Sequence, residues 1–260
     1  MSPKYKNVLI NSTLAFIAAF LITTILHELG HYLAYLIYEA NPTLFHTFVQ
    51  TPAIFLTTGE RIFSALAGPL ASLLQALLFG IVVSRGPKNS VSYLLFLWLS
   101  LLGFVNFFGY LVMTPFSAKG DTGKIAELLG LSQPSKVVIA LLGFALLVWL
   151  IRKMARIFSI FIPARLEEKQ RSKYIYHLMF FPIMIGSLLN TGLAFPVVAV
   201  MSIVYPATSA YVIMSSFPVI LRTPSFKLTL PGIDEKIVIG LGLLTLFTII
   251  LNRLLTLGWG

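Results

Sequence analysis

Long stretches of this chain carry no charged side chain. Residues 8–26 contain no Asp, Glu, Lys or Arg, and neither do residues 174–221. A helix needs about 20 predominantly apolar residues to span the hydrocarbon core of a bilayer. Only 11% of the whole chain is charged, whereas soluble domains carry about 25%. The sequence therefore predicts an all-α, multi-pass membrane protein, which we expect in the cell membrane.

We expect six or seven transmembrane helices. The segments that we expect to span are 8–38, 62–84, 91–113, 137–151, two helices within 174–221 that are broken near 191–196, and 237–252. The segment Val137–Ile151 is the shortest of these. Residues 43–58 are too polar to span and are rich in Thr and Phe. For them we predict a short β-hairpin or a re-entrant segment, which other parts of the protein must cover at membrane depth.

The net charge of +10 favours the lipid bilayer as partner. The basic residues lie in short loops between apolar runs, where Lys and Arg contact lipid head groups. We therefore expect no nucleic-acid partner. The chain has no cysteine, so disulfides and thiolate metal sites are excluded and His, Asp and Glu remain as strong metal ligands.

A metal-binding motif lies inside the first apolar run. The sequence His27-Glu28-Leu29-Gly30-His31 is H-E-x-x-H. Residues four apart share one face of a helix, so both imidazoles can reach one ion, with Glu28 beside them. Placing an ionisable residue within a membrane span costs free energy, so such a residue is first assumed to have a function. This motif therefore predicts a zinc site in which Glu28 contacts a water without being a ligand.

A catalytic zinc needs a third protein ligand and an open position. The candidates are His46, His177, Asp121, Asp234 and the glutamates 39, 60, 127, 167, 168 and 235. Asp121 differs from the others because it follows a long apolar span and lies between Gly120 and Gly123, which allow close approach of the backbone. From the residues alone it stays one candidate among several. We expect His46 and His177 to be packing or interface histidines.

The order of these motifs resembles the site-2 protease family of intramembrane zinc metalloproteases. H-E-x-x-H lies in an early span, Ala67-Gly68-Pro69 in the next, and a Pro115-x5-Asp121 motif follows the third. The resemblance covers residues 25–124. It implies that His27, His31 and Asp121 bind Zn²⁺ and that Glu28 is the catalytic base. It also implies that a membrane-spanning protein is the substrate.

This chain departs from the family pattern near the aspartate. Val112 stands where the family has an asparagine, and Thr122 separates Asp121 from Gly123. Asn106, earlier in the same span, is our candidate to replace the asparagine, which in the family supports the substrate or the oxyanion. We divide the chain into a metalloprotease-like core, 1–134, and C-terminal helices, 135–260, that the resemblance leaves without a role.

We expect hydrolysis of a peptide bond, with Glu28 moving the proton from water to the leaving amine. The unwound substrate could pair with the edge of segment 43–58. The alternative is a non-proteolytic membrane protein, a transporter or scaffold, that retains a zinc site. Thr23 and Thr24, one turn before the motif, are candidates to support the histidines, or they hydrogen-bond to their own helix backbone.

Charge and resemblance disagree about orientation. The Lys and Arg count places the N-terminus and residues 152–173 in the cytoplasm, so that the Asp121 loop faces outward. Site-2 proteases generally hold zinc toward the cytoplasmic side, which implies the reverse. The charge count and the resemblance agree if the segment Val137–Ile151 is re-entrant, because the basic loop and the Asp121 loop then lie on the same side of the membrane. We therefore predict a re-entrant segment there and a zinc site on the cytoplasmic side.

Overall fold

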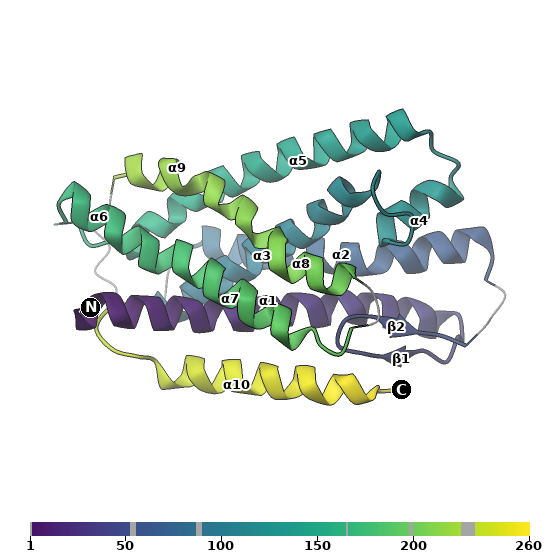
Figure 1. Ribbon diagram of the computed structural model, residues 1–260, viewed down its shortest axis with the longest axis horizontal. Helices are drawn as coiled ribbons and strands as arrows, with labels where there is room; N and C mark the ends of the chain where they lie inside the picture. The colour runs from purple at the N-terminus through teal and green to yellow at the C-terminus, as the bar shows by residue number, and fades with distance from the viewer. Residues whose placement is uncertain (1, 53–55, 87–89, 165, 198–199, 225–231) are drawn as a thin grey trace.

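The protein is a bundle of long helices that lie roughly side by side (Figure 1). The computed structural model describes residues 2–52, 56–86, 90–164, 166–197, 200–224 and 232–260. Within them, seven helical segments are long and apolar enough to cross a membrane. This confirms the expected all-α multi-pass architecture and the upper of the two expected span counts.

The helices follow the apolar segments of the sequence. Their bounds are α1 Pro3–Ile37, α2 Thr58–Ser84, α3 Ser90–Met113, α4 Asp121–Leu128, α5 Gln133–Ala155, α6 Glu168–Ile175, α7 Phe181–Leu193, α8 Met201–Thr208, α9 Phe217–Arg222 and α10 Ile239–Leu254. Short irregular helical turns join α6 to α7 and α8 to α9, so that residues 168–193 and 202–222 form single spans. The expected break near 191–196 therefore lies between two spans.

Helix α1 is the most buried span and organises the bundle. Its neighbours include α2, α3, α7 and α10. On one side Trp98 of α3 packs edge-on against Phe16 and donates a hydrogen bond to Ser12 Oγ, 3.2 Å away. On the other side α2 lies so close that a Cβ at Gly30 would be 2.5 Å from the carbonyl oxygen of Ala67. The small residues Gly30 and Ala67 thus permit close packing of the two helices.

A two-stranded hairpin covers the C-terminal end of α1. Strands β1 Thr43–Leu44 and β2 Val49–Gln50 pair antiparallel, which confirms the hairpin expected within residues 43–58. Leu44 also exchanges two backbone hydrogen bonds with Trp259, at 2.7 and 2.9 Å. Because β1 is paired on both sides, the edge of this small sheet that stays unpaired within the described part of the chain is β2. Trp259 in turn stacks on Tyr32 of α1.

The prediction of a re-entrant segment at Val137–Ile151 is wrong. Helix α5 begins at Gln133, where Ser132 caps it and Pro134 occupies the first turn, and continues to Ala155 and then as a 3-10 turn to Phe161. The predicted span ended just before the basic pair Arg152 and Lys153. In the structure these residues lie in the last turn of the helix, where cations are favoured by the helix dipole.

Candidate metal centre

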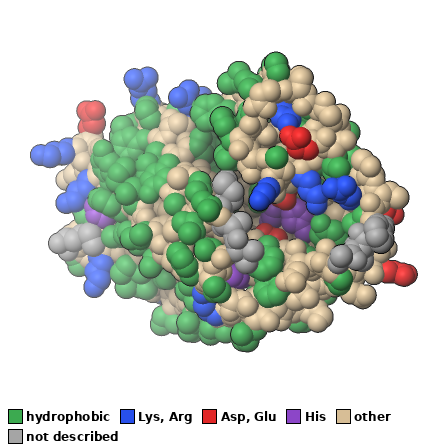
Figure 2. Space-filling view, turned by 45° about the vertical axis from the view of Figure 1, so that its right-hand side comes forward, with side chains coloured by type: hydrophobic (Ala, Val, Ile, Leu, Met, Phe, Trp, Pro, Cys, Tyr) green, Lys and Arg blue, Asp and Glu red, His purple; other side chains and the backbone are tan. Residues whose placement is uncertain are grey.

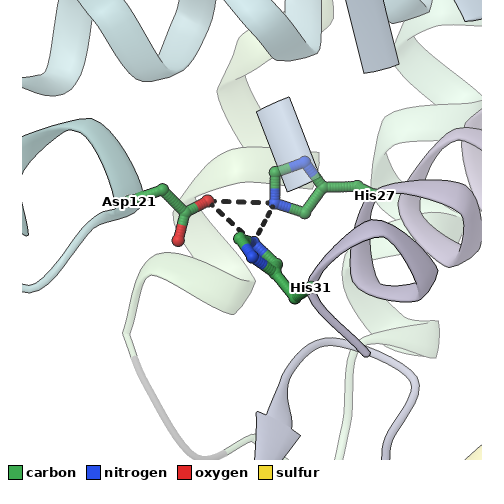
Figure 3. Close-up of side chains that lie close together, drawn as sticks. All are labelled: His27, His31 and Asp121. Carbon is green, nitrogen blue, oxygen red and sulfur yellow. Dashed lines mark hydrogen bonds and ion pairs between the residues drawn. The ribbon is translucent and has the colours of Figure 1, made fainter. Parts of the chain in front are cut away.

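His27 and His31 project from one face of α1 toward a common point (Figure 3). Their Nε2 atoms lie 3.2 Å apart. Oδ2 of Asp121 lies 3.0 Å from the first and 3.2 Å from the second. Both histidines are buried, with less than a tenth of their surface exposed. The structure thus brings one carboxylate to two imidazoles that lie about ninety residues earlier in the chain.

Asp121 reaches the histidines because the loop before α4 folds tightly against α3. It occupies the first position of α4, after Gly120. Thr122 donates a 2.5 Å hydrogen bond to the carbonyl of Tyr110 and accepts one from Thr114 at 2.9 Å. A Cβ at Gly123 would overlap the backbone of residue 117 of the same loop. Thr122, where this chain departs from the family pattern, therefore holds the loop against α3 by hydrogen bonding.

The two histidines are held in the tautomer that a metal ligand needs. Nδ1 of His31 lies 2.7 Å from the carbonyl oxygen of Ser64, which only accepts, so Nδ1 carries the proton. Nδ1 of His27 lies 3.3 Å from Ser72 Oγ, which donates its own proton to the carbonyl of Gly68. With both protons on Nδ1, each Nε2 presents a lone pair. Such partners are the usual support of metal-ligating histidines.

The spacing of the three ligand atoms fits a small cation. Tetrahedral zinc with bonds of about 2.0–2.1 Å separates its ligand atoms by roughly 3.3 Å, and the observed separations are 3.0–3.2 Å. Without a cation or an added proton, two lone pairs and a carboxylate would face one another. The group His27, His31 and Asp121 could therefore hold a metal ion.

The carboxyl of Asp121 is ionised at neutral pH, as a ligand must be. Burial by itself raises the pKa of Asp121. Without a metal ion, a proton on Nε2 of the histidine pair takes the place of the cation; the charge of His31 and the hydrogen bonds from both histidines then outweigh burial and hold the carboxyl pKa below its usual range. Tyr110 of α3 also stacks flat on His27, with 4.7 Å between ring centroids, and so fixes the imidazole plane.

Helix α2 packs against the metal centre at Gly68 and Ser72. A Cβ at Gly68 would lie 2.6 and 2.7 Å from Cδ2 and Cε1 of His31, so only glycine fits beside the ring. Pro69 has no N–H and removes one backbone hydrogen bond from this turn of α2. Ser72 accepts a 3.0 Å hydrogen bond from Nδ2 of Asn106. Asn106 therefore contacts His27 through Ser72.

The ligand group lines a cavity of about 510 Å³ inside the bundle. Figure 2 shows histidine side chains in a hollow bordered by Lys and Arg side chains. Glu28 is 7% exposed and lines the same cavity, as do Asn106, Tyr205 and Asn190. The wall includes the β2 edge and residues of α7, α8 and α10, so both expected halves of the chain build it.

Unsatisfied polar atoms occur on the cavity wall. Oδ1 of Asn106, Oγ1 of Thr47 and both amide atoms of Asn190 are buried and make no hydrogen bond within the described residues. Buried polar groups normally have partners. A polar occupant of the cavity, such as a peptide backbone, could supply them. The sequence analysis missed Asn190, Ser72 and Tyr110, because only the fold brings them to the site.

The remaining histidines lie away from the ligand group. Nε2 of His46 donates to the carbonyl of Ala194 at 2.9 Å. Burial lowers the pKa of His46, the hydrogen bond to Ala194 partly offsets this, and the charge of Arg253 lowers the pKa further. Nδ1 of His177 donates to the carbonyl of Lys173. Thr23 and Thr24 donate to carbonyls one turn earlier in α1, the plainer of their two expected roles.

No protein-family model, curated protein or solved structure matches this chain.

Proposed function

We propose that this protein is an intramembrane zinc metalloprotease that resembles the site-2 proteases and cleaves membrane-spanning proteins. The observation that carries the proposal is the convergence of His27, His31 and Asp121 beside Glu28, in a cavity within a bundle of membrane-spanning helices. A carboxylate placed next to a two-histidine, one-carboxylate group is the arrangement of zinc peptidases.

Zinc is the metal that the donor set favours. Two imidazole nitrogens and one carboxylate oxygen are the ligands of catalytic zinc sites that keep a fourth, open position. Within the described residues the ligand group has three members, whereas structural zinc is normally closed by four ligands. This difference favours a catalytic site over a structural one.

Glu28 would act as the general base. Zinc, when bound, supplies Lewis acidity and lowers the pKa of a coordinated water toward about 7. Glu28 would take the proton of the attacking water and deliver it to the leaving amide nitrogen. The amide oxygen of Asn106, which has no hydrogen-bond partner among the residues that the structure describes, would hold a substrate N–H. The free edge of β2 would pair with an extended substrate segment.

The test separates an enzyme from a protein that only binds metal. Glu28→Gln should retain zinc and lower cleavage of a single-span reporter by about 100-fold or more, the usual contribution of a general base. His31→Ala should lose both zinc and cleavage. Glu168→Gln is the matched control and should change neither, because Glu168 is an exposed carboxylate at the start of α6, at the end of the bundle opposite the hairpin (Figure 1). Equal processing by wild type and Glu28→Gln, or none by wild type, would favour a transporter or scaffold that retains a zinc site.

A further inference from the structure

The basic residues of this protein gather at one end of the bundle. We call this end the basic face; it carries the N-terminus, the C-terminal end of α2, α6 and the C-terminal end of α9 (Figure 1). The opposite end, the site face, carries the hairpin, α4 and the C-terminus. Because the seven spans alternate in direction, each connecting segment belongs to one face only.

Among the described residues, eleven Lys and Arg lie at the basic face and five at the site face. Those at the basic face are Lys4, Lys6, Arg85, Arg152, Lys153, Arg156, Lys169, Arg171, Lys173, Arg222 and Lys236. Those at the site face are Arg61, Lys119, Lys124, Lys136 and Arg253. Four Asp or Glu lie at each face, so the asymmetry comes from Lys and Arg alone.

The basic side chains are placed as at a membrane interface. Lys4 lies over the ring of Tyr174, Lys153 over Trp149 and Lys173 over a tyrosine of α1, each within 5.5 Å of the ring centroid. Amphipathic aromatic rings and long cations are typical of the head-group region. Lys and Arg in short loops near span ends are enriched on the cytoplasmic side, and anionic lipids there attract them.

The metal centre lies near the other face. His27 is ten residues before the end of α1 at Ile37, about 15 Å along the helix. It is 24 residues after Pro3, about 36 Å from the basic face. The ligand Asp121 lies in a segment of the site face. The site therefore belongs to the half of the membrane that is remote from the basic face.

We propose that the basic face is the cytoplasmic face, seated against anionic lipid head groups, and that the metal centre opens toward the non-cytoplasmic side. Because α5 is a complete span, the basic residues after it and the Asp121 loop lie at opposite faces, so the charge count and the family resemblance stay opposed, and the proposal follows the charge count. If the protein is a protease, which rests on the proposed function, it cuts membrane-spanning substrates near their non-cytoplasmic end. The orientation itself does not depend on catalysis.

Single cysteines test the orientation, since the natural chain has none. Thr58→Cys and Ala118→Cys probe the site face, and Ser84→Cys and Gln170→Cys probe the basic face. All four positions are exposed and lie outside the metal centre. Each variant is treated with a membrane-impermeant thiol reagent in sealed right-side-out vesicles and, as a control, after permeabilisation.

The site-face cysteines should be labelled in sealed vesicles, and the basic-face cysteines only after permeabilisation. The reverse pattern, or labelling of both faces from outside, overturns the proposed orientation. Two positions on each face keep the test decisive if one variant does not reach the membrane. A single-span reporter with its cleavable segment at either end then tests the substrate side. Correct orientation with no cleavage of either reporter counts against the proposed protease and leaves the orientation standing.

Discussion

Replacing Gly68 by alanine should remove His31 from the metal centre while leaving every ligand residue in the chain. The added Cβ would lie 2.6 and 2.7 Å from two carbons of the His31 ring, whereas ordinary contact begins at 3.4 Å, so the ring must move by at least about 0.8 Å. Metal–ligand distances vary by only about 0.2 Å. The shift therefore detaches one of three ligands.

The expected loss of zinc affinity is at least about 100-fold. Changes to residues that merely support a ligand cost about 10–100-fold, and displacing the ligand itself should exceed that range, which corresponds to about 2.7 kcal/mol or more. The affinity is measured by competition with a chelator on the purified protein in detergent. Gly109→Ala is the matched control. It lies in α3 on the same cavity, and a Cβ there meets no atom within 4 Å, so zinc binding should be unchanged.

A double-mutant cycle checks that the cause is the ring of His31. In the His31→Ala background the clash disappears, so Gly68→Ala should have little effect on thermal unfolding there, although it lowers the unfolding temperature in wild type. Wild-type zinc affinity in Gly68→Ala would refute the reasoning. Equal destabilisation in both backgrounds would show that the added methyl acts on helix packing and not on the ligand.

Other substitutions have similarly definite outcomes. Gly123→Ala should displace the aspartate loop and lower zinc content, whereas Gly120→Ala, whose Cβ would meet no atom closer than 3.5 Å, should not. Ser72→Ala removes the acceptor for Nδ1 of His27 and should weaken zinc binding about 10–100-fold in the same competition assay. Because burial lowers the pKa of His46, the unfolded chain binds the proton more tightly than the folded one. Stability conferred by neutral His46 is therefore present above the unfolded pKa of about 6.5 and lost as the pH falls below it. The unfolding temperature should drop less between pH 7.5 and 5.5 in His46→Gln than in wild type, and an equal drop would contradict this.

The sequence by itself determined the features that depend on one segment at a time. Apolar runs of about 20 residues are stable only as membrane helices, so the seven spans could be predicted to within a few residues at most ends. His27 and His31 share a face because they are four residues apart on one helix. The basic pair at 152 and 153 misled the prediction for α5, because hydropathy ends a span at the first charges whereas the helix continues through them.

Only the tertiary structure decided which distant groups meet. The local sequence pattern alone did not distinguish Asp121 from Asp234 or the glutamates as the third metal ligand. It joins the histidines because the contact of Thr122 with α3 and the missing side chain of Gly123 let the loop close on the cavity. Asn106 is tied to His27 through Ser72 of another helix, and α7 brings Asn190 to the same cavity. Such contacts depend on how the helices pack against one another, and the residue pattern of a single segment does not show which other segments it will contact.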